Sequence, residues 1–159
     1  MFKLNYWKLA ISIVACQLAG VIGSFATSSS VTTWYPELIK PTFNPPSWLF
    51  APVWIILYAL MGVALYMVWD KGIKTKQSKW AIKLFGFQLG LNSLWSVLFF
   101  GLKNPLLAFL EIIILWTAIL LMIMAFRRIS KPAAYLLIPY ILWVSFAAIL
   151  NFSLFYLNM

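Results

Sequence analysis

The chain has 159 residues, of which 64% are hydrophobic and only 9% are charged, and its mean hydropathy is +0.94. This number of polar residues is too small to cover the surface of a water-soluble domain. The composition therefore excludes a soluble globular protein and indicates an integral membrane protein. The chain carries a net charge of +9, no histidine and one cysteine, which excludes a disulfide framework, the usual zinc sites and a histidine-ligated haem.

Five apolar segments are each long enough to cross a hydrocarbon core of roughly 30 Å at about 1.5 Å per residue. Their continuous apolar runs lack the alternation of barrel strands, so the sequence predicts an all-α membrane protein, a single five-transmembrane-helix bundle over residues 1–159. The first segment could instead be a signal peptide, but it is longer than an h-region of about 7–15 residues, which favours a retained helix. The segments are residues 7–26, 48–69, 81–101, 106–126 and 133–157.

Basic residues gather at one set of segment ends, and only Lys40 and Lys103 lie at the opposite ends. The positive-inside rule therefore predicts a cytoplasmic N-terminus and an external C-terminus. This placement explains the net charge by topology and by contact with the lipid bilayer, so no nucleic-acid partner is expected. The gathered residues are Lys3, Lys8, Lys71, Lys74, Lys76, Lys79, Lys83, Arg127, Arg128 and Lys131.

Between the first two apolar segments the chain reads WYPELIKPTFNPPSWLFAPVW, from Trp34 to Trp54. Its five prolines remove backbone donors and fix φ, so most of this stretch cannot form an ordinary helix. A rigid aromatic stretch beside an apolar helix predicts a roofed cavity. We expect residues 34–46, here called the proline-rich segment, to form its lid on the external side, and residues 48–58 to form its wall.

Three apolar segments carry aromatic and polar side chains along one helix face. Packing and interfacial anchoring are the commoner roles of membrane aromatics. Interfacial anchoring explains Trp7 and Trp69, which lie near segment ends. It does not explain Trp143 well, because roughly 15 Å separates Trp143 from the inner end of its segment. The stripes are Trp54, Tyr58 and Met61 with Trp48 and Phe50 at the mouth, then Gln88, Asn92, Trp95 and Phe99, then Pro139, Trp143, Ala147 and Asn151.

The predicted topology places Asn92, Trp95, Glu111 and Asn151 in the outer half of the bilayer, beneath the proline-rich segment. An intramembrane carboxyl group such as that of Glu111 is a functional-site hypothesis by default. The alternative is a structural role in which amide and indole donors hold Glu111. The asparagines likewise either bond neighbouring helices or contact a ligand.

The third segment also carries a ridge of small residues. Gly86 and Gly90 have the GxxxG spacing that lets helix backbones approach closely, and Ser93 and Val97 continue the ridge. This ridge lies on a different face from Gln88, so we predict a homodimer interface there. Packing within one protomer is the alternative.

The acidic residues argue against conventional catalysis. Glu37, Asp70 and Glu111 are the only acids in the chain, so the sequence offers no paired carboxylates, catalytic triad or metal cluster. Tryptophan and tyrosine could instead hold a planar apolar macrocycle by stacking. Without histidine, a metal-free porphyrin is a more natural guest than haem, and no cofactor is required.

Four motifs together resemble the TspO/MBR family of tryptophan-rich translocator proteins over residues 34–151. They are WYPELIKPTFNPP, PVWIILYALMGVALYMVW, LNSLWSVLFFG and AAYLLIPYILWVSFAAILN. The resemblance implies a five-helix, dimeric membrane protein whose pocket binds porphyrins such as protoporphyrin IX and, in animal relatives, cholesterol. It also implies light-dependent porphyrin breakdown, as reported for some bacterial relatives, with Trp54 and Trp143 matching the indoles linked to that activity.

Two departures qualify the resemblance. The chain ends LNFSLFYLNM with no basic residue after its tyrosine, so the animal sterol motif is incomplete and sterol is not an expected partner. Leu107 stands where some relatives place a pocket tryptophan, so a guest would sit differently here. The expected ligand contacts are Trp34, Trp48, Phe50, Trp54, Tyr58, Gln88, Asn92, Trp95, Leu107, Glu111, Trp143, Ala147 and Asn151.

The leading functional hypothesis is a tetrapyrrole-binding sensor or receptor in a bacterial inner membrane. A small porphyrin transporter is the first alternative, but transport favours polar groups through the full membrane depth, whereas here they gather in the outer half. A membrane scaffold that works through its dimer and lipid-facing surfaces is the second.

Overall fold

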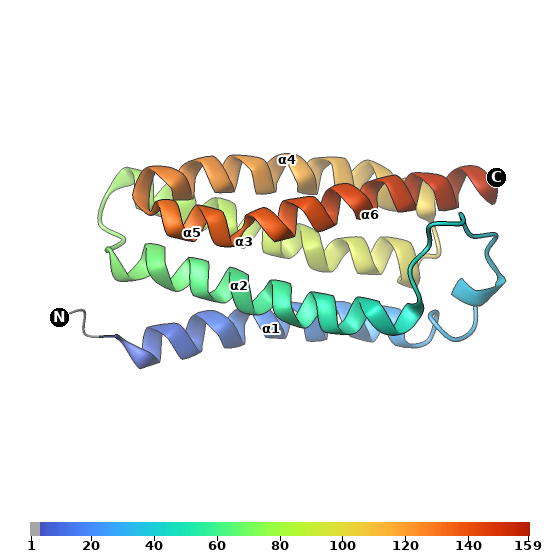
Figure 1. Cartoon of the computed structure of the whole chain (residues 1–159), viewed down its shortest axis with the longest axis horizontal. Coiled ribbons are helices and arrows are strands. Elements are labelled where there is room, and N and C mark those ends of the chain that lie inside the picture. The colour runs from blue at the N-terminus through green and yellow to red at the C-terminus, as the bar shows by residue number, and fades with distance from the viewer. Residues whose placement is uncertain (1–3) are drawn as a thin grey trace.

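The computed structural model describes residues 4–159, so Lys3 of the predicted basic group lies outside the described residues. Five helical spans form one bundle, as Figure 1 shows, and they confirm the predicted all-α, five-span architecture. No strand occurs within residues 4–159. The helices are α1 (Tyr6–Ser28), α2 (Phe50–Asp70), α3 (Lys76–Ser96), α4 (Pro105–Ile129), α5 (Lys131–Leu136) and α6 (Ile138–Leu157).

Side-chain caps set where three of the helices begin. Asn5, Thr75 and Asn104 each accept a hydrogen bond from a backbone N–H in the first turn of α1, α3 and α4. With this cap, α3 begins at Lys76 rather than at residue 81. The lysines of its first turns can extend their charged ends to water, so the extra turn needs no apolar surroundings.

Two spans depart from regular α-helix. The third ends in η3 (Val97–Gly101), a π-helical turn that carries Phe99 against the proline-rich segment. The fifth, predicted as one helix over residues 133–157, is broken at Leu137 between α5 and α6. Pro139 accounts for the break, because it has no N–H and its ring clashes with the carbonyl one turn earlier.

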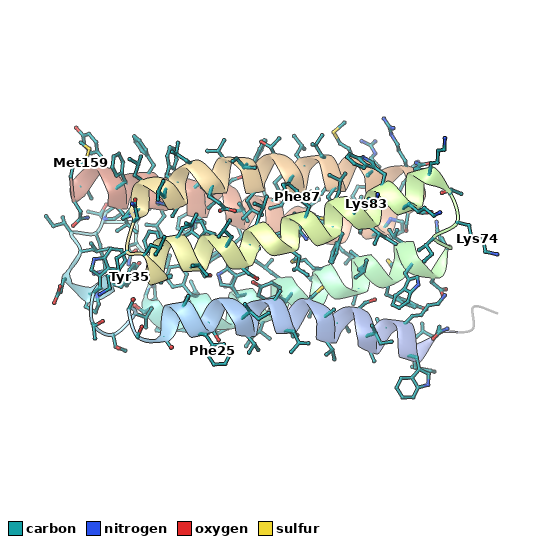
Figure 2. The ribbon with its side chains drawn as sticks, turned by 180° about the vertical axis from the view of Figure 1, so that it is seen from behind. Phe25, Tyr35, Lys74, Lys83, Phe87 and Met159 are labelled. Carbon is teal, nitrogen blue, oxygen red and sulfur yellow. The ribbon has the colours of Figure 1, made fainter. Side chains whose placement is uncertain are left out.

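The bundle has two chemically different ends. The loop end holds the proline-rich segment, the α3–α4 connection and the C-terminus, and the basic end holds the α2–α3 connection and the α4–α5 corner (Figure 1). Figure 2 shows Tyr35 and Met159 at the loop end and Lys74 at the basic end. The membrane side that each end faces stays a prediction of the charge rule.

A tight seam between α1 and α2 fixes the position of Tyr58. A Cβ atom on Gly62 would lie 2.6 Å from the Cα of Ile13, and one on Gly20 would lie 2.5 Å from the Tyr58 ring. Both distances are shorter than van der Waals contact, so only glycine fits at these two positions. The seam presses Tyr58 of α2 toward the interior of the bundle.

Toward the basic end the interior is apolar and closely packed. Ile119, Met122 and Phe126 are fully buried, and the Phe126 ring stacks on Phe85 with 5.9 Å between the ring centroids. The buried cluster that contains them consists of apolar residues together with Tyr58 and Tyr140. Three buried serines, Ser12, Ser78 and Ser130, lie toward the basic end, whereas the buried amide and carboxyl side chains, Gln88, Asn92, Glu111 and Asn151, lie from the middle of the bundle toward the loop end.

Candidate functional site

The proline-rich segment is folded on its own aromatic and polar groups. Tyr35 is buried, and its hydroxyl donates a 2.9 Å hydrogen bond to Oδ1 of Asn44. The Lys40 ammonium lies 5.0 Å from the centre of the Tyr35 ring and donates to the carbonyls of Pro36 and Leu38 at 3.0 and 3.1 Å. Burial raises the pKa of the Tyr35 phenol above its ordinary value of 10.0, while the bond to Asn44 acts in the opposite direction.

Buried packing and hydrogen bonds tie this segment to the helices. Tyr35 shares a buried cluster with Phe99, Ala108, Leu150 and Leu154. Asn158, at the end of α6, accepts from the Ile39 N–H and donates to the Ile39 carbonyl, both at 2.9 Å. Just before the segment, the Ser30 hydroxyl donates to the Phe100 carbonyl at 2.7 Å. We call the paired bonds between Asn158 and Ile39 the Asn158 clamp. The predicted lid is therefore a compact loop attached to the bundle at separate points.

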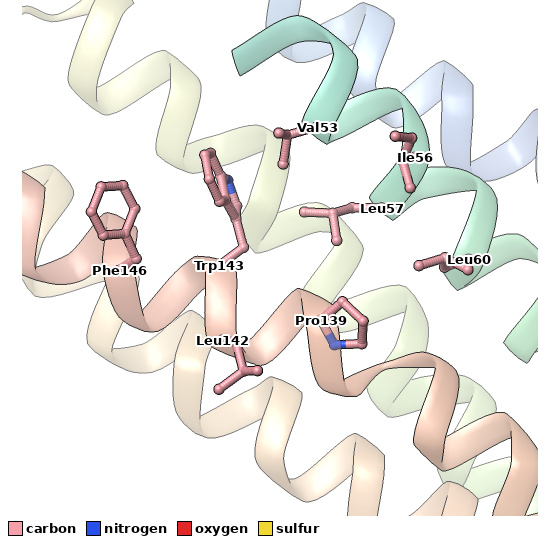
Figure 3. A pocket seen from close by; sticks show the side chains of 8 residues that line it. All are labelled: Val53, Ile56, Leu57, Leu60, Pro139, Leu142, Trp143 and Phe146. Atoms are coloured by element: carbon pink, nitrogen blue, oxygen red, sulfur yellow. The ribbon is translucent and has the colours of Figure 1, made fainter. Parts of the chain in front are cut away.

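A groove of about 470 Å³ lies between α2 and α6, as Figure 3 shows. Each helix contributes four side chains at spacing i, i+3, i+4 and i+7, which places them on one helix face. Ile56 and Leu142 are exposed, so the groove opens on the outside of the bundle, where lipid acyl chains would lie. The lining residues are Val53, Ile56, Leu57 and Leu60 of α2 and Pro139, Leu142, Trp143 and Phe146 of α6.

One end of this groove is aromatic and meets the proline-rich segment. The Trp143 ring centre lies 6.0 Å from that of Phe50 and 5.5 Å from that of Phe146. Phe43 of the proline-rich segment lies 6.3 Å from Phe146. The structure thus brings together two predicted ligand residues, Phe50 and Trp143, where the groove meets the predicted lid.

Behind the groove, a buried hydrogen-bond network links α2, α3 and α6. The Tyr58 hydroxyl donates to Oδ1 of Asn92, whose amide donates to the Tyr140 hydroxyl at 3.0 Å. Tyr140 in turn donates to Oε1 of Gln88 at 2.8 Å. The Trp54 ring packs in front of the network, 5.5 Å from Tyr58 and 6.3 Å from Tyr140. Three predicted ligand residues, Tyr58, Gln88 and Asn92, are therefore engaged with protein groups.

A second interhelical connection lies nearer the loop end. Nε1 of Trp95 donates to Oδ1 of Asn151 at 3.0 Å, and the Asn151 amide donates to the Pro105 carbonyl at 2.8 Å. The Trp95 ring stacks on Phe99 with 5.1 Å between centroids. Both predicted ligand residues, Trp95 and Asn151, thus join α3, α4 and α6.

Glu111 is the one acid buried in the described bundle. It is 6% exposed, and neither carboxyl oxygen has a hydrogen-bond partner among residues 4–159. The donors expected to hold it are used elsewhere, because Asn92, Trp95 and Asn151 bond to other groups. The two carboxyl oxygens are therefore buried hydrogen-bonding groups whose capacity is unused by the protein groups around them.

The remaining predicted ligand residues are dispersed. Trp34 packs edge-on against Phe99, with 5.6 Å between centroids. Ala147 is half-buried against the main core. Trp48 and Leu107 are 71% and 43% exposed, and neither lines the groove.

The predicted dimer ridge on α3 divides into two parts. A Cβ atom on Gly86 or Gly90 would meet nothing within 4 Å, so this part of the ridge is open. Val97 is also exposed. Ser93, however, donates a 3.0 Å hydrogen bond to the Ala19 carbonyl of α1 and so packs within the protomer.

Sequence reasoning missed most of the groove lining, since Trp143 is its only member among the predicted ligand contacts. The missed residues on α2 are aliphatic, and their one signal is their shared helix face. Lipid-facing aliphatic residues give the same signal, so periodicity alone could not separate the two environments.

Comparison with known proteins covers nearly the whole chain. The TspO/MBR family model matches residues 12–157. The tryptophan-rich protein TspO of Chlorobaculum tepidum is 46% identical over 150 residues, which are 94% of this chain and 95% of the relative. That of Archaeoglobus fulgidus is 47% identical over 155 residues, 98% and 99% of the two chains. The translocator protein of Ovis aries is 37% identical over 136 residues, 85% and 80% of the two chains.

Proposed function

Because the chain belongs to the TspO/MBR family of integral membrane proteins, we propose that it is a membrane sensor or receptor for tetrapyrroles such as protoporphyrin IX. The groove between α2 and α6 is the observation that carries this proposal. Its volume of about 470 Å³ lies within the usual range for small-molecule sites, roughly 300–1,000 Å³. Its apolar lining with aromatic rings at one end suits a planar hydrophobic guest.

The guest's orientation follows from polarity. We place the macrocycle against Trp143 and Phe146, with its apolar edge along the aliphatic face of α2. Its carboxylates then point to the loop end, where Lys40 and Lys103 are the cations among the described residues. The Glu111 carboxyl group, without a hydrogen-bond partner among residues 4–159, is a further polar group in the same half of the bundle.

Light-dependent oxidation of the bound porphyrin is a second step of the proposal. The excited porphyrin accepts an electron from a nearby indole and passes it to dissolved oxygen, which becomes superoxide. The indole radical then recovers an electron from the porphyrin, and the oxidised ring combines with the superoxide, so that the net change is addition of oxygen to the porphyrin. Trp143 lines the groove, whereas Trp54 lies behind it against Tyr58 and Tyr140. Trp143 is therefore the donor in contact with the guest, and Trp54 is the donor one layer further in.

The test is a titration with protoporphyrin IX in darkness and under light. We expect Trp143→Phe to weaken binding and slow bleaching, and Trp54→Phe to slow bleaching with a smaller effect on affinity. Trp80→Phe is the matched control, because Trp80 is 58% exposed near the basic end. Equal behaviour of all three variants and the wild type would refute the assigned groove.

Transport is less well supported than binding. A transported amphipath needs polar groups through the full depth, whereas the half toward the basic end is filled by buried apolar side chains. We therefore expect no porphyrin flux into sealed proteoliposomes. Flux that depends on Trp143 would favour the transporter instead.

We also propose a homodimer through the open part of the α3 ridge, in a bacterial cell membrane with the N-terminus in the cytoplasm. Gly86→Leu with Gly90→Leu should reduce the crosslinked dimer, because the bulky side chains would hold two α3 helices apart. Both glycines are exposed, and a Cβ atom at either position would meet nothing within 4 Å in the protomer. A dimer that persists undiminished would exclude this interface.

A further inference from the structure

A second hollow, of about 340 Å³, lies at the other end of the bundle from the proline-rich segment. Its lining is Met124, Arg127, Arg128 and Lys131, at the corner where α4 passes into α5. The four residues follow the spacing i, i+3, i+4 and i+7, and all four side chains are exposed. Three cations and one apolar side chain thus surround a single hollow.

Charge around this hollow is unbalanced. Asp70 is the one acid at the basic end among residues 4–159, and it is already paired with Lys8 at 3.2 Å. A further cation, Lys71, donates to the Ile129 carbonyl at 2.8 Å, in the last turn of α4. The negative end of the α4 dipole amounts to about half a charge, so it offsets only part of this excess.

The surroundings of the hollow are those of a membrane interface. Leu120 and Leu121, one turn before Met124, are 37% and 47% exposed on the outside of the bundle. The cations therefore stand at the end of a lipid-facing apolar surface. One guanidinium group can donate two parallel hydrogen bonds to two oxygens of a phosphate, whereas a lysine ammonium binds phosphate as a point charge.

We propose that this corner binds one anionic phospholipid, independently of the tetrapyrrole groove. Its phosphate lies among Arg127, Arg128 and Lys131, and the start of an acyl chain lies against Met124. A zwitterionic lipid offers the same phosphate, but its ammonium group would meet the surrounding cations. A free phosphate ion would use the cations without the apolar side chain.

The test compares lipid binding by the delipidated protein in neutral detergent, measured by native mass spectrometry. We expect phosphatidylglycerol to bind about tenfold more tightly than phosphatidylcholine. The triple variant Arg127→Gln, Arg128→Gln, Lys131→Gln should abolish this preference. Arg127→Lys with Arg128→Lys keeps the charge and should retain part of it.

A matched control removes the same charge elsewhere. Lys74→Gln, Lys76→Gln, Lys79→Gln neutralises three exposed lysines outside the hollow and should leave the preference unchanged. Equal loss in both triple variants would overturn the proposal in favour of general attraction to the basic end. Displacement of phosphatidylglycerol by millimolar inorganic phosphate would overturn it in favour of an ion site.

Discussion

The two halves of this bundle differ in the side chains that fill their interiors and line their ends. Toward the basic end, apolar side chains fill the interior and cations line the rim. The Tyr58, Asn92, Tyr140 and Gln88 network lies near the middle of the bundle, and the unpartnered Glu111 lies toward the loop end. The difference shows that buried apolar packing and buried hydrogen bonding dominate at different depths of the bundle, and each can be tested separately.

The largest expected effect is a loss of stability in the apolar half. Phe126→Ala removes a fully buried ring that stacks on Phe85, and such truncations cost about 3–5 kcal/mol of unfolding free energy. Leu142→Ala, at the exposed groove, should cost about 0.5 kcal/mol or less. Denaturant unfolding in detergent measures both. Similar costs at the two sites would show that the buried apolar cluster contributes no more to stability than the exposed groove lining.

Next in size is the effect of breaking the buried network. Asn92→Leu leaves the Tyr58 hydroxyl without its acceptor, which should cost about 1–3 kcal/mol. Adding Tyr58→Phe removes the orphaned hydroxyl, so the double variant should recover part of that loss. A double variant whose loss equals the sum of the two single losses would mean that the hydrogen bond does not couple them.

A smaller effect is expected at the Asn158 clamp. Asn158→Ala removes the two hydrogen bonds to Ile39 and a third to the Leu154 carbonyl, worth about 0.5–1.5 kcal/mol each, and should speed amide exchange at Ile39 and porphyrin association in darkness. Ser153→Ala is the control, because Ser153 bonds only within α6, to the Ile149 carbonyl. Unchanged exchange in Asn158→Ala would show that the segment is held by its other contacts.

The smallest effect is a pH dependence of the same segment. Burial raises the pKa of Tyr35, so the folded segment holds the phenolic proton more tightly than the unfolded one. This contribution is complete below pH 10.0 and is lost as the pH rises through the folded pKa. Amide exchange in the segment should therefore accelerate at high pH in the wild type, beyond the intrinsic rate. Tyr35→Phe should remove that extra acceleration.

Sequence reasoning reached the architecture more fully than the site. Length and hydropathy define a transmembrane span locally, so the five spans could be predicted, and charge placement separated the two ends. Trp95 and Asn151 were predicted to lie in the same half of the bilayer, and the structure joins them by a hydrogen bond. The break at Leu137 was missed, although Pro139 was visible, because proline can also be accommodated within a membrane helix.

The groove and the clamp could not be predicted in the same way. Leu57 lines the groove and Ile55 faces outward, yet both are ordinary aliphatic residues of one helix. Asn158 and Ile39 are separated by 119 positions, so nothing local links them. Such features depend on how the helices pack, and they appear only when the helices are placed relative to one another.

The Asn158 clamp has a practical consequence for anyone who purifies this protein. An affinity tag fused after Met159 would begin two positions after Asn158, whose side chain is hydrogen-bonded to the backbone of the proline-rich segment. Its bulk or charge could shift the ligand exchange rates that an assay reports. Cleavable tags at the opposite terminus would leave these hydrogen bonds undisturbed, and kinetic values from differently tagged preparations should be compared only with this in mind.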